Sequence, residues 1–301
     1  MVSDQNRLNQ LLEMMSSPEV NKRNFKGMIY GTMGHGKTHL ALQILDEIVE
    51  PDKIILHVDT SHNKDVAPQV GMRHKVQPLP FTTIEDLRLV AEAITEQQTP
   101  WNTVGGILFD ESSTIALEDL DRIYETRKHL IETGQRKTPK DGVPETPDWA
   151  DYRPGLQRFR SLMSNLHNVP GLHVVEVAHE RFNEKLNAIT PDFAPAIVKE
   201  IVKPLHLVAR LVADVSQQVG SDEATYTRTV QIHPVGLVQA KSRLGVPTVK
   251  FGAEFLPGIV KGWVDAGAIE HPEQPPIPEP AVVGGPGSDS EGNDPFANVD
   301  M

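Results

Sequence analysis

Residues 31–40 read GTMGHGKTHL, and the expected fold follows from this stretch. Gly31, Gly36, Lys37 and Thr38 match the pattern G-x-x-x-x-G-K-[ST] of a phosphate-binding loop. Glycines at these positions let backbone N–H groups turn toward the phosphates, where a Cβ would block the approach. We expect Lys37 to contact the β- and γ-phosphates and the Thr38 hydroxyl to ligate Mg²⁺.

The sequence on either side of the loop supports this interpretation. Residues 25–30 (FKGMIY) predict a short strand that enters the loop. Residues 38–49 (THLALQILDEIV) carry apolar side chains at helical spacing, which predicts a helix with its N-terminus toward the anion. With ATP and Mg²⁺ as the expected cofactors, the predicted nucleotide-binding residues are Gly31, Thr32, Met33, Gly34, His35, Gly36, Lys37 and Thr38.

The composition limits the class of protein. A chain of 301 residues is long enough for one large α/β domain with appendages. It has no cysteine, which excludes disulfides and thiolate metal sites and fits a cytoplasmic protein. We find no apolar run long enough to cross a membrane, and residues 1–20 are too polar for a signal peptide.

Charge is distributed unevenly along the chain. The net charge is -12, but more than half of it lies in residues 270–301, which contain seven acidic residues and no Lys or Arg. Basic patches elsewhere are therefore compatible with the overall negative charge. This Pro/Gly-rich acidic tail is expected to be disordered.

Short apolar strands alternate with helical segments. Nearly continuous apolar runs at residues 53–59, 104–109 and 173–178 are typical of a parallel sheet buried on both faces. We therefore expect an α/β fold with a mostly parallel sheet covered by helices. Three regions are expected: an N-terminal helical segment (1–24), a core (25–269) and the tail (270–301). Residues 134–154 predict a long loop or lid, and residues 225–238 predict a late antiparallel hairpin.

The second half of the expected site requires a carboxylate at the end of an apolar strand. Asp110, in GGILFDE, meets this requirement and is the predicted partner of Mg²⁺. Glu111 is the candidate that polarises the attacking water, and Asp59, at the end of KIILHVD, competes for that role. Both lie where ligands bind in an open parallel sheet. His179 ends the strand HVVEVAH, either as a γ-phosphate sensor or as a structural histidine.

The order of these motifs resembles that of the RecA-type ATPases, and most closely that of phage-encoded RecA-like single-strand annealing proteins. The likeness spans about residues 25–251 and is carried by GTMGHGKT, ILFDES, PDWADYRPG, VVEVAH and QAKSRLG. It implies a RecA-like P-loop core and a DNA-stimulated, Mg-dependent ATPase that acts in DNA recombination. If the chain is phage-encoded, its location would be the host cytoplasm.

The resemblance also implies a homo-oligomer, a ring or filament with ATP between adjacent subunits. Lys241 and Arg243, in AKSR, match the position that acts on the γ-phosphate of the neighbouring subunit. The other interpretation is that both are solvated basic residues at a strand end. A hexameric helicase, a packaging motor and a non-catalytic scaffold stabilised by nucleotide are the alternative functions.

Single-stranded DNA is the expected partner, and two polar stretches are candidate DNA-binding loops. Residues 136–153 and 180–203 both mix basic and aromatic side chains, which suits backbone contacts and base stacking. Alternatively, the aromatic residues Trp149 and Phe193 anchor these loops to the core. The candidates are Arg136, Lys137, Lys140, Trp149 and Tyr152 in the first stretch, and Arg181, Phe182, Lys185 and Phe193 in the second.

The tail contains Asp294-Pro295-Phe296 and resembles the acidic tip of bacterial single-stranded-DNA-binding proteins. A docking peptide for a recombination partner is one interpretation. A solubilising tail, or one that competes with DNA, is the other.

Overall fold

A computed structural model describes residues 24–60, 72–80, 83–137, 145–184, 186–193, 198, 201–217 and 224–266. The expected N-terminal helix, Lys140, Lys185 and the acidic tail lie outside these residues. The strands are β1 (Lys26–Gly31), β2 (Ile54–Asp59), β3 (Val76–Pro80), β4 (Val104–Asp110), β5 (His173–Asn183), β6 (Ala188–Pro191), β7 (Leu207–Gln217), β8 (Ala224–Gln231), β9 (Lys241–Ser242) and β10 (Lys250–Gly252). The helices are α2 (Lys37–Ile48), α3 (Ile84–Thr95), α4 (Ser112–Glu132), α5 (Trp149–His167) and α7 (Leu256–Asp265), with 3-10 turns η2 (Trp101–Thr103) and η3 (Ala253–Phe255).

The strands form one sheet in the order β10-β8-β7-β1-β5-β4-β2-β3. From β7 to β3 every neighbouring pair is parallel, whereas β8 and β10 extend the β7 edge in antiparallel fashion. The predicted mixed α/β class with a mostly parallel sheet is therefore confirmed. The predicted strands at residues 25–30, 53–59, 104–109 and 173–178 correspond to β1, β2, β4 and β5.

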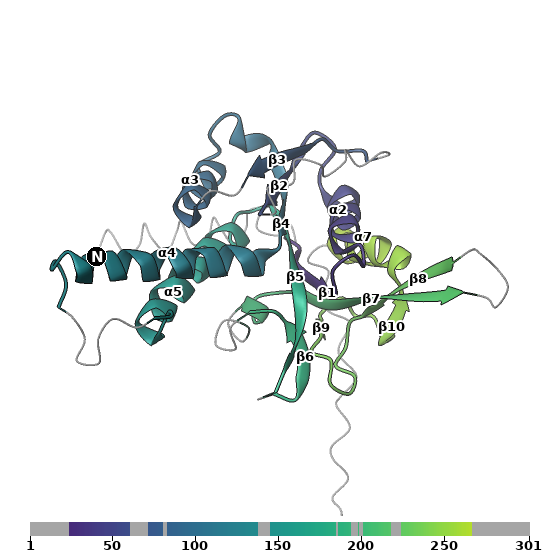
Figure 1. Cartoon of the computed structure of the whole chain (residues 1–301). Coiled ribbons are helices and arrows are strands. Elements are labelled where there is room, and N and C mark those ends of the chain that lie inside the picture. Colours follow the sequence, from purple (N-terminus) through teal and green to yellow (C-terminus); the bar gives the residue numbers. More distant parts are fainter. Residues whose placement is uncertain are drawn as a thin grey trace, which may run out of the picture. The chain divides into compact units, whose positions relative to one another are not determined.

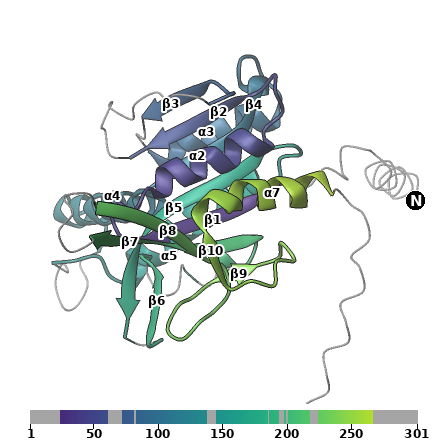
Figure 2. The same ribbon diagram turned by 90° about the vertical axis from the view of Figure 1, so that its right-hand side faces the viewer.

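Helices cover both faces of the sheet (Figures 1 and 2). One core cluster joins β1, β5 and β7 to α2 and α7, and the other joins β4 and β5 to α3, α4 and α5. Close packing of α2 requires a glycine in β4, because a Cβ on Gly106 would lie 2.8 Å from a Val49 methyl and 3.2 Å from a Leu45 methyl. The sheet is thus buried on both faces, as its apolar strands indicate.

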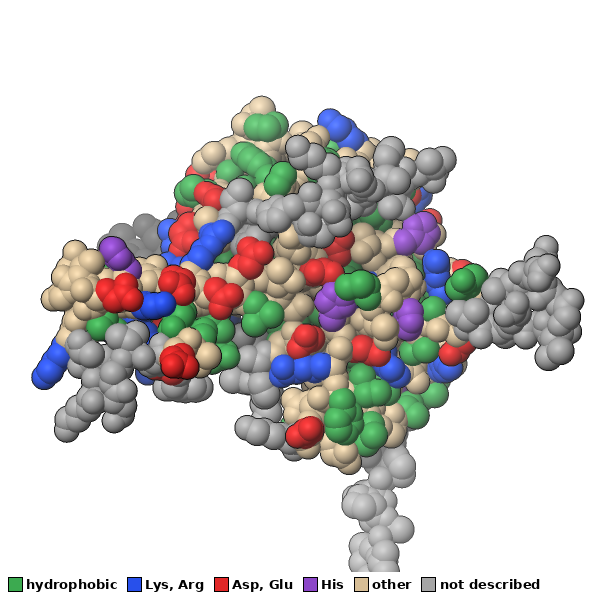
Figure 3. Space-filling view, viewed as in Figure 1, with side chains coloured by type: hydrophobic (Ala, Val, Ile, Leu, Met, Phe, Trp, Pro, Cys, Tyr) green, Lys and Arg blue, Asp and Glu red, His purple; other side chains and the backbone are tan. Residues whose placement is uncertain are grey.

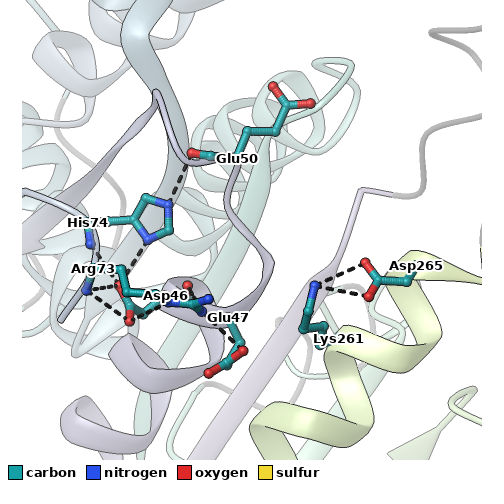
Figure 4. A network of polar contacts seen from close by, with 7 residues as sticks. All are labelled: Asp46, Glu47, Glu50, Arg73, His74, Lys261 and Asp265. Atoms are coloured by element: carbon teal, nitrogen blue, oxygen red, sulfur yellow. Dashed lines mark hydrogen bonds and ion pairs between the residues drawn. The ribbon is translucent and has the colours of Figure 1, made fainter.

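The C-terminal half of α2 is also held by a polar network (Figure 4). The Asp46 carboxylate accepts hydrogen bonds from the backbone N–H groups of Arg73 and His74, at 3.0 and 2.9 Å, and lies 2.9 Å from the His74 ring. Burial opposes ionisation of Asp46, but these hydrogen bonds outweigh it and lower its pKa. The residues that lead into β3 are thereby fixed to α2.

The expected loop at residues 134–154 is wrong in its second half, because α5 begins at Trp149. Asp148 caps the helix: its side chain accepts a hydrogen bond from the Ala150 N–H, and the Asp151 side chain accepts one from the Asp148 N–H, a capping box. The cap fixes the start of α5, and the helix continues through Pro154.

Two further expectations need correction. The antiparallel hairpin does not lie within residues 225–238, because β8 pairs with β7, whose strand precedes it in the chain. Residues 180–193 do not form a loop throughout: β5 continues to Asn183 and pairs with β6 in an antiparallel hairpin. β7 (LVARLVADVSQ) and the last residues of β5 (ERFN) mix apolar and charged side chains, and β6 (AITP) is very short, so none of them has the continuous apolar run by which the other strands were found.

Candidate functional site

The glycine-rich segment forms the predicted strand-loop-helix unit. β1 ends at Gly31, and α2 begins at Lys37. Gly31, Gly34 and Gly36 have φ values of 156°, 79° and 86°, a region that side chains rarely adopt. At Gly31 a Cβ would also lie 2.3 Å from the Leu211 carbonyl oxygen of β7. The loop therefore needs glycine for its conformation and, at Gly31, for its packing.

Lys37 lies within the loop. Its side-chain amine donates a hydrogen bond to the Thr32 carbonyl at 3.0 Å, and the residue is buried. Burial lowers the pKa of Lys37, while the negative charges of Glu111, Asp110 and Glu180 oppose that shift. The amine thus lies near three carboxylates, at the position expected of a phosphate-binding lysine.

Asp110 contacts Thr38, the residue whose hydroxyl is expected to bind the metal. The Thr38 hydroxyl donates to Asp110 Oδ1 and Oδ2, at 3.0 and 3.1 Å. On the other side, His57 Nε2 of β2 lies 3.2 Å from Asp110 Oδ2. His57 was not predicted as a site residue, because its only signal is a polar residue inside the apolar run IILHVD. It orients the carboxylate, and it is buried.

Glu111 is joined to His179. His179 Nε2 lies 2.7 Å from Glu111 Oε1, so the end of the predicted strand in β5 meets the residue that follows β4. Glu111 has φ 61°, an uncommon value for a residue with a side chain, and it occupies the N-cap position of α4. The Ser112 hydroxyl donates to the Val177 carbonyl at 3.2 Å and fixes this junction.

Asp59 lies at the carboxyl end of β2, next to Asp110 at the carboxyl end of β4. It is the register partner of Asp110 between β2 and β4, and it is buried. Asp59 and Glu111 therefore both remain near the carboxyl ends of the central strands, as expected from the sequence. Glu111 has the contact with His179. The assignment of the water-activating carboxylate stays a prediction.

A second set of charges ties the loop to β5 and β7, and the sequence analysis missed it. Glu180 accepts a hydrogen bond from the Thr32 hydroxyl at 2.8 Å and from Arg210 Nε at 2.7 Å. Burial opposes ionisation of Glu180, but the hydrogen bonds from Arg210 and Thr32 prevail and lower its pKa. This ion pair holds Thr32 in place. Histidine, acidic and basic side chains gather near the middle of the face in Figure 3, where β1, β5 and β7 of Figure 1 meet.

Lys241 and Arg243 lie at the amino-terminal end of the parallel strands, the end opposite the phosphate loop. β9 pairs with the first residues of β7, which are beside the first residues of β1, whereas the loop follows the other end of β1. The Lys241 amine donates to the carbonyls of Val202 and Lys203, at 2.9 and 2.7 Å. Within one chain, these two residues and the phosphate loop are therefore not brought together.

The candidate DNA-binding residues fall in two places. Arg136 and Lys137 are exposed just beyond the end of α4, and Trp149 is the first residue of α5. Arg181 and Phe182 lie on the β5–β6 hairpin, where Phe182 is 52% exposed.

Phe193 matches the second interpretation, in which it anchors its loop to the core, whereas Tyr152 is partly exposed. Phe193 is buried, with its ring centroid 6.2 Å from that of Phe159 of α5, so it anchors the hairpin to the core and is not available for stacking on DNA. Tyr152 lies on α5 beside α4, in a small pocket lined also by Phe193. Arg181 is paired with Asp192 at 3.3 Å.

The described residues contain neither a metal-binding cluster nor a membrane-spanning helix. Within those ranges no group of three or more His, Asp or Glu side chains is arranged to hold a metal ion. Across the same residues no helix combines the length and the apolar character needed to cross a bilayer.

Comparison with protein families gives one match. A family model described as an AAA domain matches residues 23–244, which include the loop, Asp110, Glu111, His179 and β9. The chain belongs to the AAA domain family. This membership makes it a nucleotide-binding domain of the P-loop ATPase type, in agreement with the loop geometry. No curated protein matches the chain.

Proposed function

We propose that this AAA domain protein is a Mg-dependent ATPase that binds single-stranded DNA and promotes strand annealing or exchange, as a ring or filament with ATP between subunits. One observation carries the proposal: the phosphate loop and the two basic residues expected to act on the γ-phosphate lie far apart within a single chain. The loop and its carboxylates lie at one edge of the sheet, and Lys241 and Arg243 lie at the other. Two copies are needed to bring them together.

The residues at the loop fit ATP and Mg²⁺. Thr38 and Asp110 supply oxygen ligands of the kind that Mg²⁺ prefers, and their mutual hydrogen bonds keep them adjacent. The loop glycines and Lys37 would hold the phosphates. Mg²⁺ held by these two residues would neutralise negative charge on the phosphates.

In this proposal Glu111 acts on the attacking water. Its carboxylate orients the water and accepts its proton, and His179 holds the carboxylate in position through the 2.7 Å contact. An ordered Glu–His pair argues for hydrolysis and against a scaffold that only binds nucleotide. Arg243 of an adjacent copy would stabilise the charge that develops on the phosphates.

The proposed DNA contacts are the exposed candidates at the two sites described above. Arg136 and Lys137 provide phosphate contacts, and Phe182 provides a stacking surface beside Arg181. The sequence resemblance supports DNA as the partner, because PDWADYRPG starts α5 and VVEVAH leads into the β5–β6 hairpin. One candidate segment therefore precedes, and the other follows, an element whose motif carries the resemblance.

ATP turnover with and without single-stranded DNA of mixed sequence tests the proposal. We expect stimulation by single strands, little by duplex, and DNA affinity that falls about 10–100-fold between about 50 and 200 mM salt. Phe182→Ala should weaken DNA binding without changing basal turnover, and Leu117→Ala, an exposed apolar residue of α4, is the matched control. ATP turnover that never responds to DNA, or strand unwinding by the protein, would reject this function.

A further inference from the structure

The β7–β8 hairpin lies directly against the phosphate loop. The Leu211 carbonyl of β7 fills the place where a Cβ on Gly31 would be. Two residues along, the Ala213 N–H lies 3.3 Å from His35 Nδ1, at hydrogen-bonding distance. β7 thus contacts the loop at Gly31 and at His35. β8 is the next strand of the sheet after β7. The side chains of β8 that point toward α2 consequently lie beside the loop.

Arg228 of β8 reaches the last glycine of the loop. It pairs in register with Ala213. A Cβ on Gly36 would lie 3.1 Å from both the guanidinium carbon and Nη1 of Arg228, so the guanidinium covers this glycine. Among the residues that the structure describes, none forms a hydrogen bond or ion pair with the Arg228 side chain. Its donors are therefore available to an anion bound in the loop.

Tyr226 continues the same face of β8. Alternate residues of a strand point to one side, so Tyr226, Arg228 and Val230 share a face. Val230 is buried in the core cluster that contains α2, which shows that this face is turned toward α2 and its N-terminal loop. Tyr226, two residues farther from the core than Arg228, is 69% exposed. The exposed ring of Tyr226 therefore lies next to the unpaired guanidinium of Arg228 on the face of β8 that is turned toward the loop.

The direction of a bound triphosphate follows from the strand order. Asp110, Glu111 and His179, the groups suited to the terminal phosphate, are on β4 and β5, to one side of β1. β7 and β8 lie on the other side of β1. A triphosphate whose terminal phosphate faces β4 and β5 directs its nucleoside toward β7 and β8, because the loop N–H groups hold the phosphates between these ends.

We propose that Arg228 binds the phosphate nearest the nucleoside and that Tyr226 stacks on the base, so that β8 forms the nucleoside subsite. This inference rests on the proposed binding of ATP. A ring that stacks on a base gives affinity with little choice among bases, since every base has a π-face. We therefore expect ATP and GTP to be bound with similar affinity, and triphosphates that lack a base to bind more weakly.

Equilibrium binding of Mg-ATP and of Mg-tripolyphosphate to the full chain separates the two roles. Tyr226→Ala should raise the Kd for ATP about 10–100-fold and leave the Kd for tripolyphosphate unchanged. Tyr226→Phe keeps the ring and should restore ATP binding. Arg228→Ala should weaken both ligands, and Lys250→Ala, an exposed basic residue of β10, should weaken neither.

The outcomes distinguish this subsite from the ATP site itself. Wild-type binding of ATP together with an unchanged Kd in Tyr226→Ala and Arg228→Ala would overturn the subsite and leave the proposed ATPase intact. Equal losses for ATP and tripolyphosphate in Tyr226→Ala would also overturn it, since a stacking ring affects only the base. A wild-type chain that binds neither ligand would overturn the ATP site and the subsite together.

Discussion

His179 Nε2 and Glu111 Oε1 lie 2.7 Å apart, and this contact joins β5 to the residue that follows β4. The two strands are neighbours on the side of β1 where Asp110 also lies. A shift of either strand end would therefore move the Glu111 carboxylate relative to the loop. The pair links the position of the candidate base to β5, the strand that leads into the β5–β6 hairpin proposed to contact DNA.

Removal of the His179 ring should slow turnover more than it weakens ATP binding. The ring positions Glu111, which acts in the transition state, so His179→Ala should lower kcat about tenfold or more with KM within about threefold. His179→Gln, which can still donate a hydrogen bond, should recover part of kcat. His129→Ala on the exposed side of α4 serves as the control. A rise in KM at constant kcat would assign His179 to binding instead.

Asp110 should make nucleotide binding depend on Mg²⁺. Asp110→Asn removes the charge that Thr38 and His57 hold in place, so the gain in ATP affinity on adding Mg²⁺ should shrink about tenfold or more. Binding measured in excess chelator should change little. His57→Ala should give a smaller effect of the same kind, because it only orients the carboxylate. An equal loss with and without Mg²⁺ would contradict this role.

The effects of two substitutions on turnover distinguish Glu111 from Asp59 as the carboxylate that activates water. Glu111→Gln should preserve ATP binding and lower kcat about 100-fold or more, because the amide cannot accept the proton of the water. Asp59→Asn should have the smaller effect on kcat, since the 2.7 Å contact with His179 positions Glu111. Single-turnover hydrolysis measures both. Retained turnover in Glu111→Gln with loss in Asp59→Asn would transfer the role to Asp59.

The parts of the fold that could be predicted are those with a continuous local signal. β1, β2, β4 and the first half of β5 are short apolar runs, and the loop has a fixed residue pattern, so both were found. The carboxyl ends of parallel strands meet at one edge, which is why Asp110, Glu111 and His179 were expected near the loop, and they lie near it.

The missed elements depend on contacts between distant segments. β7 (LVARLVADVSQ) interrupts its apolar residues with Arg210 and Asp214, and it becomes a strand because it pairs with β1 and β8. His57, Glu180 and Arg210 were not recognised as site residues because their roles come from partners on other strands. The start of α5 was not predicted, because it is polar and contains Pro154. Asp148 and Asp151 nevertheless have the spacing of a capping box.

Lys241 and Arg243 should act across a subunit boundary. The chain places them at the sheet edge opposite the loop, so an inactive Lys37→Ala protein mixed with an inactive Arg243→Ala protein should regain part of the ATPase activity. A mixed interface can combine an intact loop with an intact arginine. Lys241→Ala should behave like Arg243→Ala in these mixtures, although it also removes the amine that donates to the Val202 and Lys203 carbonyls. Mixtures that exchange subunits yet never regain activity would remove support for the assignment.

Glu176 should make stability fall as the pH rises. It lies fully buried on β5, 4.0 Å from His167 Nε2, and burial raises its pKa to about 8, although the neighbouring Ser112 side chain opposes the shift. The carboxyl is thus neutral in the folded chain at pH values where the unfolded chain has already ionised it. The stabilisation that Glu176 gives the folded protein is therefore fully present below the unfolded pKa of about 4.3. It is lost progressively as the pH rises to about 8.

Glu176→Gln isolates this contribution. Between about pH 5 and 8 the wild-type free energy of unfolding should carry a falling component of about 1.4 kcal/mol per pH unit that the variant lacks. His167 and His173 have opposite effects: burial lowers their pKa values to about 3 and about 4, so their contributions are lost as the pH falls below about 6.5. They are present in both proteins and cancel in the comparison. Urea unfolding of wild type, Glu176→Gln and the exposed control Glu184→Gln measures the difference, and parallel pH profiles for all three would show that Glu176 is ionised in the folded protein.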